Sequence, residues 1–96
     1  MAINLIPMGY QQITDVSAAV GLTVPRNVES AAANYALITP QTQAIRWRDD
    51  GTDPSATVGY PLAVGSELSY DGDLTKIKFF EQAASAAINI SYYIRS

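Results

Sequence analysis

The segment INISYYIR near the C-terminus alternates between two kinds of residue over eight consecutive positions. Ile88, Ile90, Tyr92 and Ile94 occupy every second position, with Asn, Ser, Tyr and Arg between them. A strand that buries one face produces a period of two, whereas a helix would repeat its apolar residues every three or four positions. The pattern therefore predicts a β-strand that must be covered on one side by other apolar surface.

Five further segments carry a strand signature: residues 20–24, 35–39, 45–48, 68–70 and 76–80. Turn residues separate them, and the dipeptide Asp71-Gly72 predicts a tight hairpin between the last two of these segments. Asp50-Gly51 predicts a turn after 45–48, and a further short strand is possible around 56–58. With no convincing helical pattern, the sequence predicts an all-β fold, a small antiparallel β-sandwich of jelly-roll or immunoglobulin-like type with about six to eight strands.

The 96 residues suffice for one domain with one modest core. Residues 1–12 are apolar but interrupted by Pro7 and Gly9, so they form either an edge strand or an arm that reaches over a neighbouring subunit. Residues 13–96 are expected to form a single β-sandwich domain. The predicted core is Val20, Leu22, Val24, Leu37, Ile45, Trp47, Val58, Leu68, Ile77, Phe79, Ile88, Ile90 and Tyr92.

The composition argues against several classes of function. Only six Lys or Arg are present and the net charge is −3, which disfavours nucleic-acid binding. The chain has no histidine and no cysteine, so it lacks the commonest general base, thiol chemistry and cysteine-type zinc sites. No apolar run approaches the roughly 20 residues of a membrane span, and the N-terminus has no basic region of a secretory signal. We therefore expect a protein of the cytosol that is not an enzyme and has no cofactor, no nucleotide site and no membrane partner.

An acidic, arginine-bearing stretch, AIRWRDDGTDP, is the one place where charge concentrates. Asp49, Asp50 and Asp53 lie in it, and Glu67, Asp71 and Asp73 follow downstream. Calcium takes carboxylate ligands, but the spacing lacks the pattern of an EF-hand loop, and aspartate is also a common turn residue. Plain turns are the preferred interpretation, with calcium as the alternative, so no metal site is assigned.

Eight residues are candidates for contacts with another subunit. Arg46 and Arg48 lie on the strand face opposite Ile45 and Trp47, where they pair either with aspartates of their own chain or with those of a neighbour. Phe80 and Tyr93 point away from the predicted core faces and would leave aromatic surface exposed in a monomer. The remaining four are the apolar residues of the N-terminal segment: Ile3, Leu5, Ile6 and Met8.

From Ala36 to Ile94 the chain resembles small β-rich virion structural proteins of tailed bacteriophages. The resemblance rests on the IRWRDDG strand and turn, the G-Y-P-L-x-x-G connection and the closing INISYY strand, in that order. Its most specific residues are Arg46, Trp47, Arg48, Asp49, Asp50, Gly51, Gly59, Pro61, Leu62 and Gly65.

The resemblance implies a non-enzymatic component of a phage particle. It suggests a cement or decoration protein that binds the capsid exterior and bridges its subunits, assembled in the host cytoplasm and located in the virion. Its partners would be the major capsid protein or other virion proteins, and it would form a homo-oligomer, preferably a trimer. Two alternatives remain: a neck or tail accessory protein, and a carbohydrate- or receptor-binding β-sandwich. An aromatic row flanked by Asp and Asn on one exposed face would favour the last.

Overall fold

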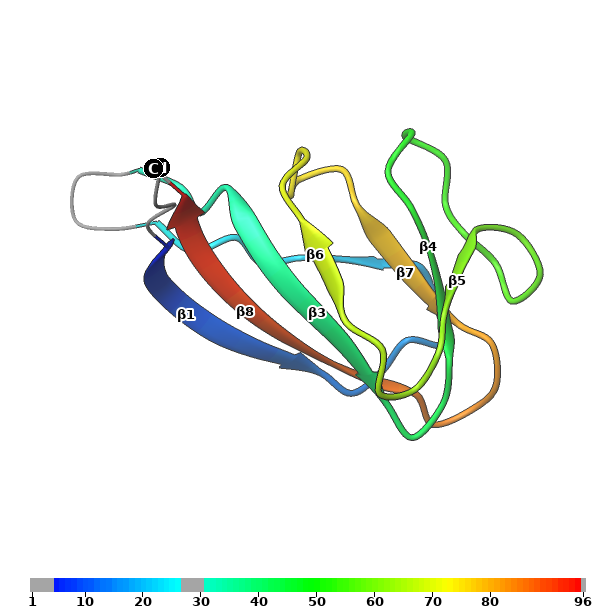
Figure 1. The fold of residues 1–96 in the computed structure, drawn as a ribbon. Helices are drawn as coiled ribbons and strands as arrows, with labels where there is room; N and C mark the ends of the chain where they lie inside the picture. Colours follow the sequence, from blue (N-terminus) through cyan, green and yellow to red (C-terminus); the bar gives the residue numbers. More distant parts are fainter. Residues whose placement is uncertain (1–4, 27–30, 96) are drawn as a thin grey trace.

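A computed structural model describes residues 5–26 and 31–95 of the chain. It contains β1 (Leu5–Ile13), β2 (Val20–Gly21), β3 (Tyr35–Gln41), β4 (Ile45–Arg48), β5 (Tyr60–Leu62), β6 (Leu68–Tyr70), β7 (Lys78–Glu81) and β8 (Ala87–Arg95). These strands form two four-stranded antiparallel sheets, ordered β1-β8-β3-β6 and β2-β7-β4-β5 (Figure 1). The described residues include no helix, least of all one long and apolar enough to cross a membrane. The predicted all-β sandwich is confirmed.

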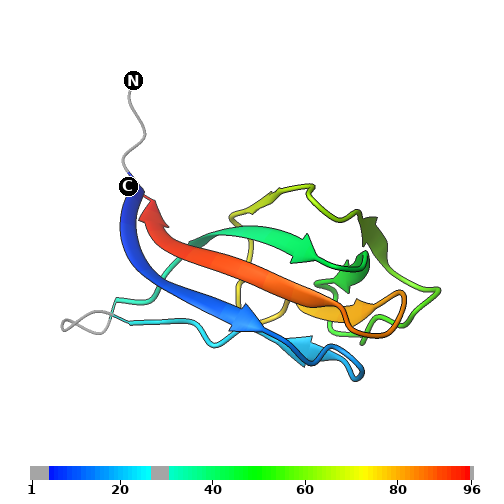
Figure 2. The same ribbon diagram turned by 90° about the horizontal axis from the view of Figure 1, so that it is seen from below.

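The strand order is that of a jelly roll. β1 pairs with β8, β2 with β7, β3 with β6 and β4 with β5, which is the pairing of one long hairpin folded over on itself. Two further pairings, β3 with β8 and β4 with β7, complete the two sheets. This pairing distinguishes a jelly roll, built from two Greek keys, from the immunoglobulin-like alternative. Each sheet therefore combines residues from both ends of the chain, and Figure 2 shows the first and last strands side by side.

The core lies between the sheets and follows the alternation of the strands. In the first sheet Ala36 and Ile38 of β3 stand opposite Tyr92 and Ile90 of β8, and all four are buried. The second sheet contributes Ile45 and Phe79, both without exposed surface. Six of the predicted core residues are buried as expected: Ile45, Ile77, Phe79, Ile88, Ile90 and Tyr92.

Two predicted core positions are wrong. Leu37 was predicted to lie in the core, but in β3 the inward positions are Ala36 and Ile38, and Leu37 pairs with Ser91 on the outer face. Val58 lies before β5 rather than in a strand, and 49% of its surface is exposed. The other predicted residues are partly buried against the core: Val20, Leu22, Val24, Trp47 and Leu68.

The predicted hairpin at Asp71-Gly72 is also wrong, because β6 belongs to the first sheet and β7 to the second. Gly72 does not have a positive φ angle. A Cβ atom at Gly72 would instead lie 2.4 Å from the hydroxyl oxygen of Tyr70, so the glycine leaves room for that side chain. At the other predicted turn, Gly51 does adopt a positive φ of 88°.

The N-terminal segment forms β1, an edge strand of the first sheet. It pairs with β8 from Leu5 opposite Arg95 to Ile13 opposite Ile88, with an irregularity between Pro7 and Gly9. Proline and a bulge are devices that protect a sheet edge from unwanted pairing. Ile3 lies outside the described residues, so its predicted role stays a prediction.

Candidate functional site

The aspartates of the acidic region each have a partner within the chain. Asp49 accepts a hydrogen bond of 2.7 Å from the hydroxyl of Tyr70, a residue that is 9% exposed. The others are arranged as follows: Asp50 with Arg48, Asp53 with Lys78, Asp71 with Arg95, and Asp73 with Thr75. Within residues 5–26 and 31–95, no three His, Cys, Asp or Glu side chains are grouped so that they could hold a metal ion.

We expect calcium to have no effect on the stability of this protein. Adding Ca²⁺ or a chelator should change the melting temperature by less than about 1 °C, because the carboxylates already have partners and a ligand stabilises only the state that it binds. The measurement is a thermal scan with Ca²⁺, with EDTA and with neither. A rise of several degrees in Ca²⁺ that EDTA reverses would establish the calcium alternative.

Arg46 and Arg48 lie on the outer face of the second sheet. Their register partners in β7 are Phe80 and Lys78, so these four side chains share one face. The Arg46 guanidinium donates hydrogen bonds to the carbonyl oxygens of Ala56 (3.1 Å) and of Gly59 (2.8 Å), which fastens the β4–β5 connection to the sheet.

Arg48 forms a two-point ion pair with Asp50 across the turn that follows β4. Its Nε and Nη2 atoms lie 3.1 and 2.5 Å from the two Asp50 oxygens. Both arginines of the IRWRDDG stretch therefore form hydrogen bonds or an ion pair within their own chain. A contact with another subunit would have to use donors that these bonds leave over.

Three exposed aspartates make the fold sensitive to acid. The pKa of Asp15 is lowered from 3.8 mainly by the Ser17 hydroxyl, that of Asp50 by the hydrogen bond from Arg48, and that of Asp73 by the Thr75 hydroxyl. The pKa values of these aspartates are lower in the folded protein than in the unfolded chain. They therefore stabilise the fold at any pH above the ordinary aspartate pKa, and this stabilisation is lost as the pH falls through the pKa values of the folded protein.

The melting temperature should therefore decline below about pH 4 and change little from about pH 5 to 8, because the chain has no histidine, the side chain whose ordinary pKa lies in that range. The measurement is a series of thermal scans across this range. The double variant Asp15→Asn, Asp73→Asn should decline less steeply below pH 4 than the native protein. A fall in melting temperature between pH 8 and 6 would contradict this account.

The outer face of the first sheet carries an aromatic row. Pro7, Tyr93 and Tyr35 stand opposite one another on three adjacent strands, and Tyr10 and Leu37 flank Ser91 on the same face. The Tyr35 and Tyr93 rings meet edge to face, with centroids 6.0 Å apart. The Tyr10 hydroxyl donates to the Asn89 side chain, so polar groups accompany the aromatic ones.

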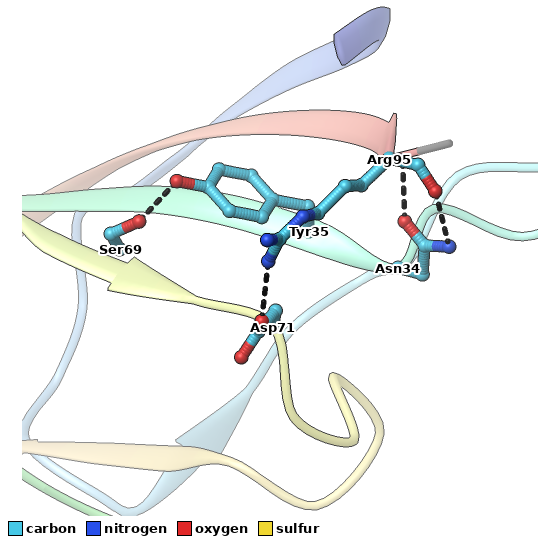
Figure 3. A network of polar contacts seen from close by, with 5 residues as sticks. All are labelled: Asn34, Tyr35, Ser69, Asp71 and Arg95. Atoms are coloured by element: carbon cyan, nitrogen blue, oxygen red, sulfur yellow. Dashed lines mark hydrogen bonds and ion pairs between the residues drawn. The ribbon is translucent and has the colours of Figure 1, made fainter. Parts of the chain in front are cut away.

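A polar network closes one end of this row (Figure 3). The Arg95 guanidinium lies 5.9 Å from the centre of the Tyr35 ring and 2.6 Å from a carboxylate oxygen of Asp71. The Tyr35 hydroxyl is hydrogen-bonded to Ser69, and the Asn34 side chain holds the backbone of Arg95 by accepting from its N–H at 2.7 Å. Sequence reasoning missed this cluster because its residues come from separate segments of the chain.

The large apolar side chains that remain exposed gather near two edge strands, β1 and β5. Leu5, Ile6 and Tyr10 of β1 are 39%, 51% and 64% exposed. Near β5, Val58, Tyr60 and Val64 are 49%, 65% and 51% exposed. We call these sets the β1 edge and the β5 edge. Figure 1 shows β1 and β5 at opposite sides of the molecule.

The predicted interface residues do not form a single patch. Leu5 and Ile6 belong to the β1 edge, while Met8 packs against the core. Tyr93 lies on the outer face of the first sheet, and Arg46, Arg48 and Phe80 lie on the outer face of the second. Sequence reasoning missed the β5 edge, because Val58 had been assigned to the core.

Comparison with known proteins gives no identity for the chain: no family model, no curated protein and no solved structure matches it. The function proposed below relies on the surfaces just described and on the resemblance of the motifs.

Proposed function

We propose that this protein is a non-enzymatic virion structural protein of a tailed phage, a cement or decoration protein that bridges neighbouring subunits on the capsid exterior. The observation that carries the proposal is the pair of apolar edges at opposite sides of one small domain. A protein that bridges two neighbours needs two separate contact surfaces. An ordinary monomer has no need to expose large apolar side chains at both of its edges.

The same geometry supports self-assembly. A contact between the β1 edge of one copy and the β5 edge of the next is head-to-tail, and such contacts close into rings when the rotation between copies allows it. A trimer on the capsid is the preferred form, with the major capsid protein or another virion protein beneath it. A ring would bind through several weak contacts at once and so gain avidity. A neck or tail position would use the same two edges.

Co-sedimentation with expanded phage heads tests this function. The native protein should pellet with the heads in a saturable manner. Replacing Leu5 and Ile6 by serine, or Val58 and Tyr60 by serine, should weaken binding by about tenfold or more, because apolar residues at the centre of a contact dominate its energy.

The exposed change Ala84→Ser in the β7–β8 connection is the matched control and should bind as the native protein does. The melting temperatures of all variants must stay close to that of the native protein. A native protein that remains in the supernatant, or edge variants that bind like the control, would refute the proposal.

A carbohydrate-binding module is a second candidate, favoured by one specific observation. Tyr10, Tyr35 and Tyr93 share the outer face of the first sheet with Asn89, and Asp71 lies at its end. Aromatic rings beside carboxylate and amide groups are suited to the alternating apolar and hydroxyl faces of a sugar. Jelly rolls serve both viral capsid and lectin domains, so the fold is compatible with either candidate and does not choose between them.

A further inference from the structure

The end of the first sheet holds a shallow depression of about 360 Å³, lined by Leu5, Tyr35, Ser69, Asp71 and Arg95. All four strands of the sheet contribute to it, Leu5 from β1, Arg95 from β8, Tyr35 from β3 and Ser69 from β6, with Asp71 directly after β6. Its volume falls within the range of about 300–1,000 Å³ that is usual for small-molecule sites.

We infer that this depression binds one pyranose unit of a neutral glycan. The inference rests on the second candidate function, and it adds the place and the chemistry of the site. The depression shares Leu5 with the β1 edge, and the residues of the β5 edge do not line it.

The charges in the depression favour a neutral ligand with adjacent hydroxyl groups. Arg95 and Asp71 lie 2.6 Å apart, so their charges cancel. The guanidinium has five N–H donors and the carboxylate two acceptor oxygens, and one contact between them leaves groups of both kinds. A pair of sugar hydroxyls can accept from the arginine and donate to the aspartate at the same time. An anion would have to compete with Asp71, and a cation would meet Arg95.

The apolar part of the depression suits the other side of a sugar ring. The C–H groups of a pyranose carry slight positive charge and pack against aromatic rings. Tyr35 lines the depression, and the Arg95 guanidinium, 5.9 Å from the centre of its ring, leaves part of that ring open to a sugar. Leu5, which is 39% exposed, adds an aliphatic wall. The Tyr35 ring is fixed by its edge-to-face contact with Tyr93 and by its hydroxyl contact with Ser69.

Arg95 is also held in place before any ligand arrives. Its guanidinium lies over the Tyr35 ring, and Asn34 brackets its backbone, accepting from its N–H at 2.7 Å and donating to its carbonyl oxygen at 3.4 Å (Figure 3). A side chain that is ordered in advance loses less conformational entropy on binding, which is the main cost for a small polar ligand.

The test is an NMR titration of the full chain with methyl glycosides of glucose, galactose, mannose and N-acetylglucosamine. At least one should shift the amides of Tyr35, Ser69, Asp71 and Arg95. Asp71→Ala and Tyr35→Ala should each weaken that binding by about tenfold or more, since each removes a principal contact. Tyr35→Phe keeps the ring and should retain most of the affinity, while thermal scans confirm that every variant is folded.

Tyr60→Ala serves as the comparison, because Tyr60 is an exposed tyrosine beside the Arg48–Asp50 pair in a separate depression. Binding that is lost in Tyr60→Ala and kept in Asp71→Ala would overturn this inference and leave the carbohydrate function standing. No shift with any glycoside would overturn both. Inorganic phosphate that shifts the same amides at lower concentration than every glycoside would show an anion site and overturn the inference too.

Discussion

Replacing Phe79 by alanine is expected to destabilise the fold by about 3–5 kcal/mol, the largest effect of any single substitution considered for this protein. Phe79 has no exposed surface and stands in β7, the strand that joins both halves of the second sheet, between Val20 of β2 and Trp47 of β4. Removing its ring leaves a cavity that neighbouring strands cannot fill without losing their register. Urea unfolding of the native protein and the variant gives the difference directly.

Phe80, the next residue, provides the matched control. It lies opposite Arg46 on the outer face of the same strand, so Phe80→Ala should cost no more than about 1 kcal/mol. If Phe79→Ala fails to fold, Phe79→Leu keeps most of the volume and allows the comparison to be made. Equal losses at the two positions would contradict the assignment of faces in β7.

The second large effect is expected at Gly72. Gly72→Ala should destabilise the protein by about 1–3 kcal/mol, because the new methyl group would lie 2.4 Å from the Tyr70 hydroxyl oxygen and 2.6 Å from Cζ. Tyr70 cannot move aside cheaply, since it is buried and its hydroxyl donates to Asp49 at 2.7 Å. Burial, followed by this hydrogen bond, raises the pKa of the Tyr70 phenol, which keeps it a donor.

A double-mutant cycle isolates this contact. Tyr70→Phe alone should cost about 1–3 kcal/mol, because Asp49 loses its donor. The double variant with Gly72→Ala should be more stable than the sum of the two losses implies. The nearest clashing atom is gone, and the ring, no longer tied to Asp49, can shift away from the new methyl group. Gly21→Ala, whose Cβ would meet nothing closer than 3.8 Å, is the control and should change stability by less than about 0.5 kcal/mol. Strict additivity would contradict the proposed contact between Gly72 and Tyr70.

The alternation of apolar and polar residues predicted where the strands lie better than it predicted which strands pair with one another. Ile88, Ile90 and Tyr92 were placed correctly because these inward residues are large and apolar, while Asn89 and Ser91 between them are polar. In β3 the rule failed, because small Ala36 and buried Pro40 share the inner face with Ile38, while Leu37 and Tyr35 lie outside. A prediction that places the larger residues inward is wrong where the core has room only for a small residue such as Ala36.

Pairings between distant strands were beyond local reasoning. Asp71-Gly72 has the sequence of a hairpin turn, yet the strands on either side of it belong to different sheets. Strand pairing in a jelly roll depends on contacts between the two halves of the chain, such as β1 with β8, and no short motif encodes these. For the same reason the cluster of Tyr35, Asp71 and Arg95, drawn from three separate segments, could not be assembled from the sequence.

The stretch AIRWRDDGTDP now has a structural explanation. Arg46 fastens the connection to β5, Arg48 pairs with Asp50, and Asp49 anchors Tyr70 from the other sheet. Its charged side chains therefore have their partners within their own chain. The described surfaces that remain for partners include the two apolar edges and the aromatic outer face.

Hydrogen–deuterium exchange on the protein bound to expanded heads tests bridging most directly. If the protein bridges through both edges, binding should slow exchange in residues 5–10 and in residues 58–64 relative to the free protein. The backbone amides of β4 and β7, whose outer face carries Arg46 and Phe80, should exchange at the same rate as in the free protein. Protection at one edge alone, or protection centred on the Arg46 and Phe80 face, would contradict the proposed bridge.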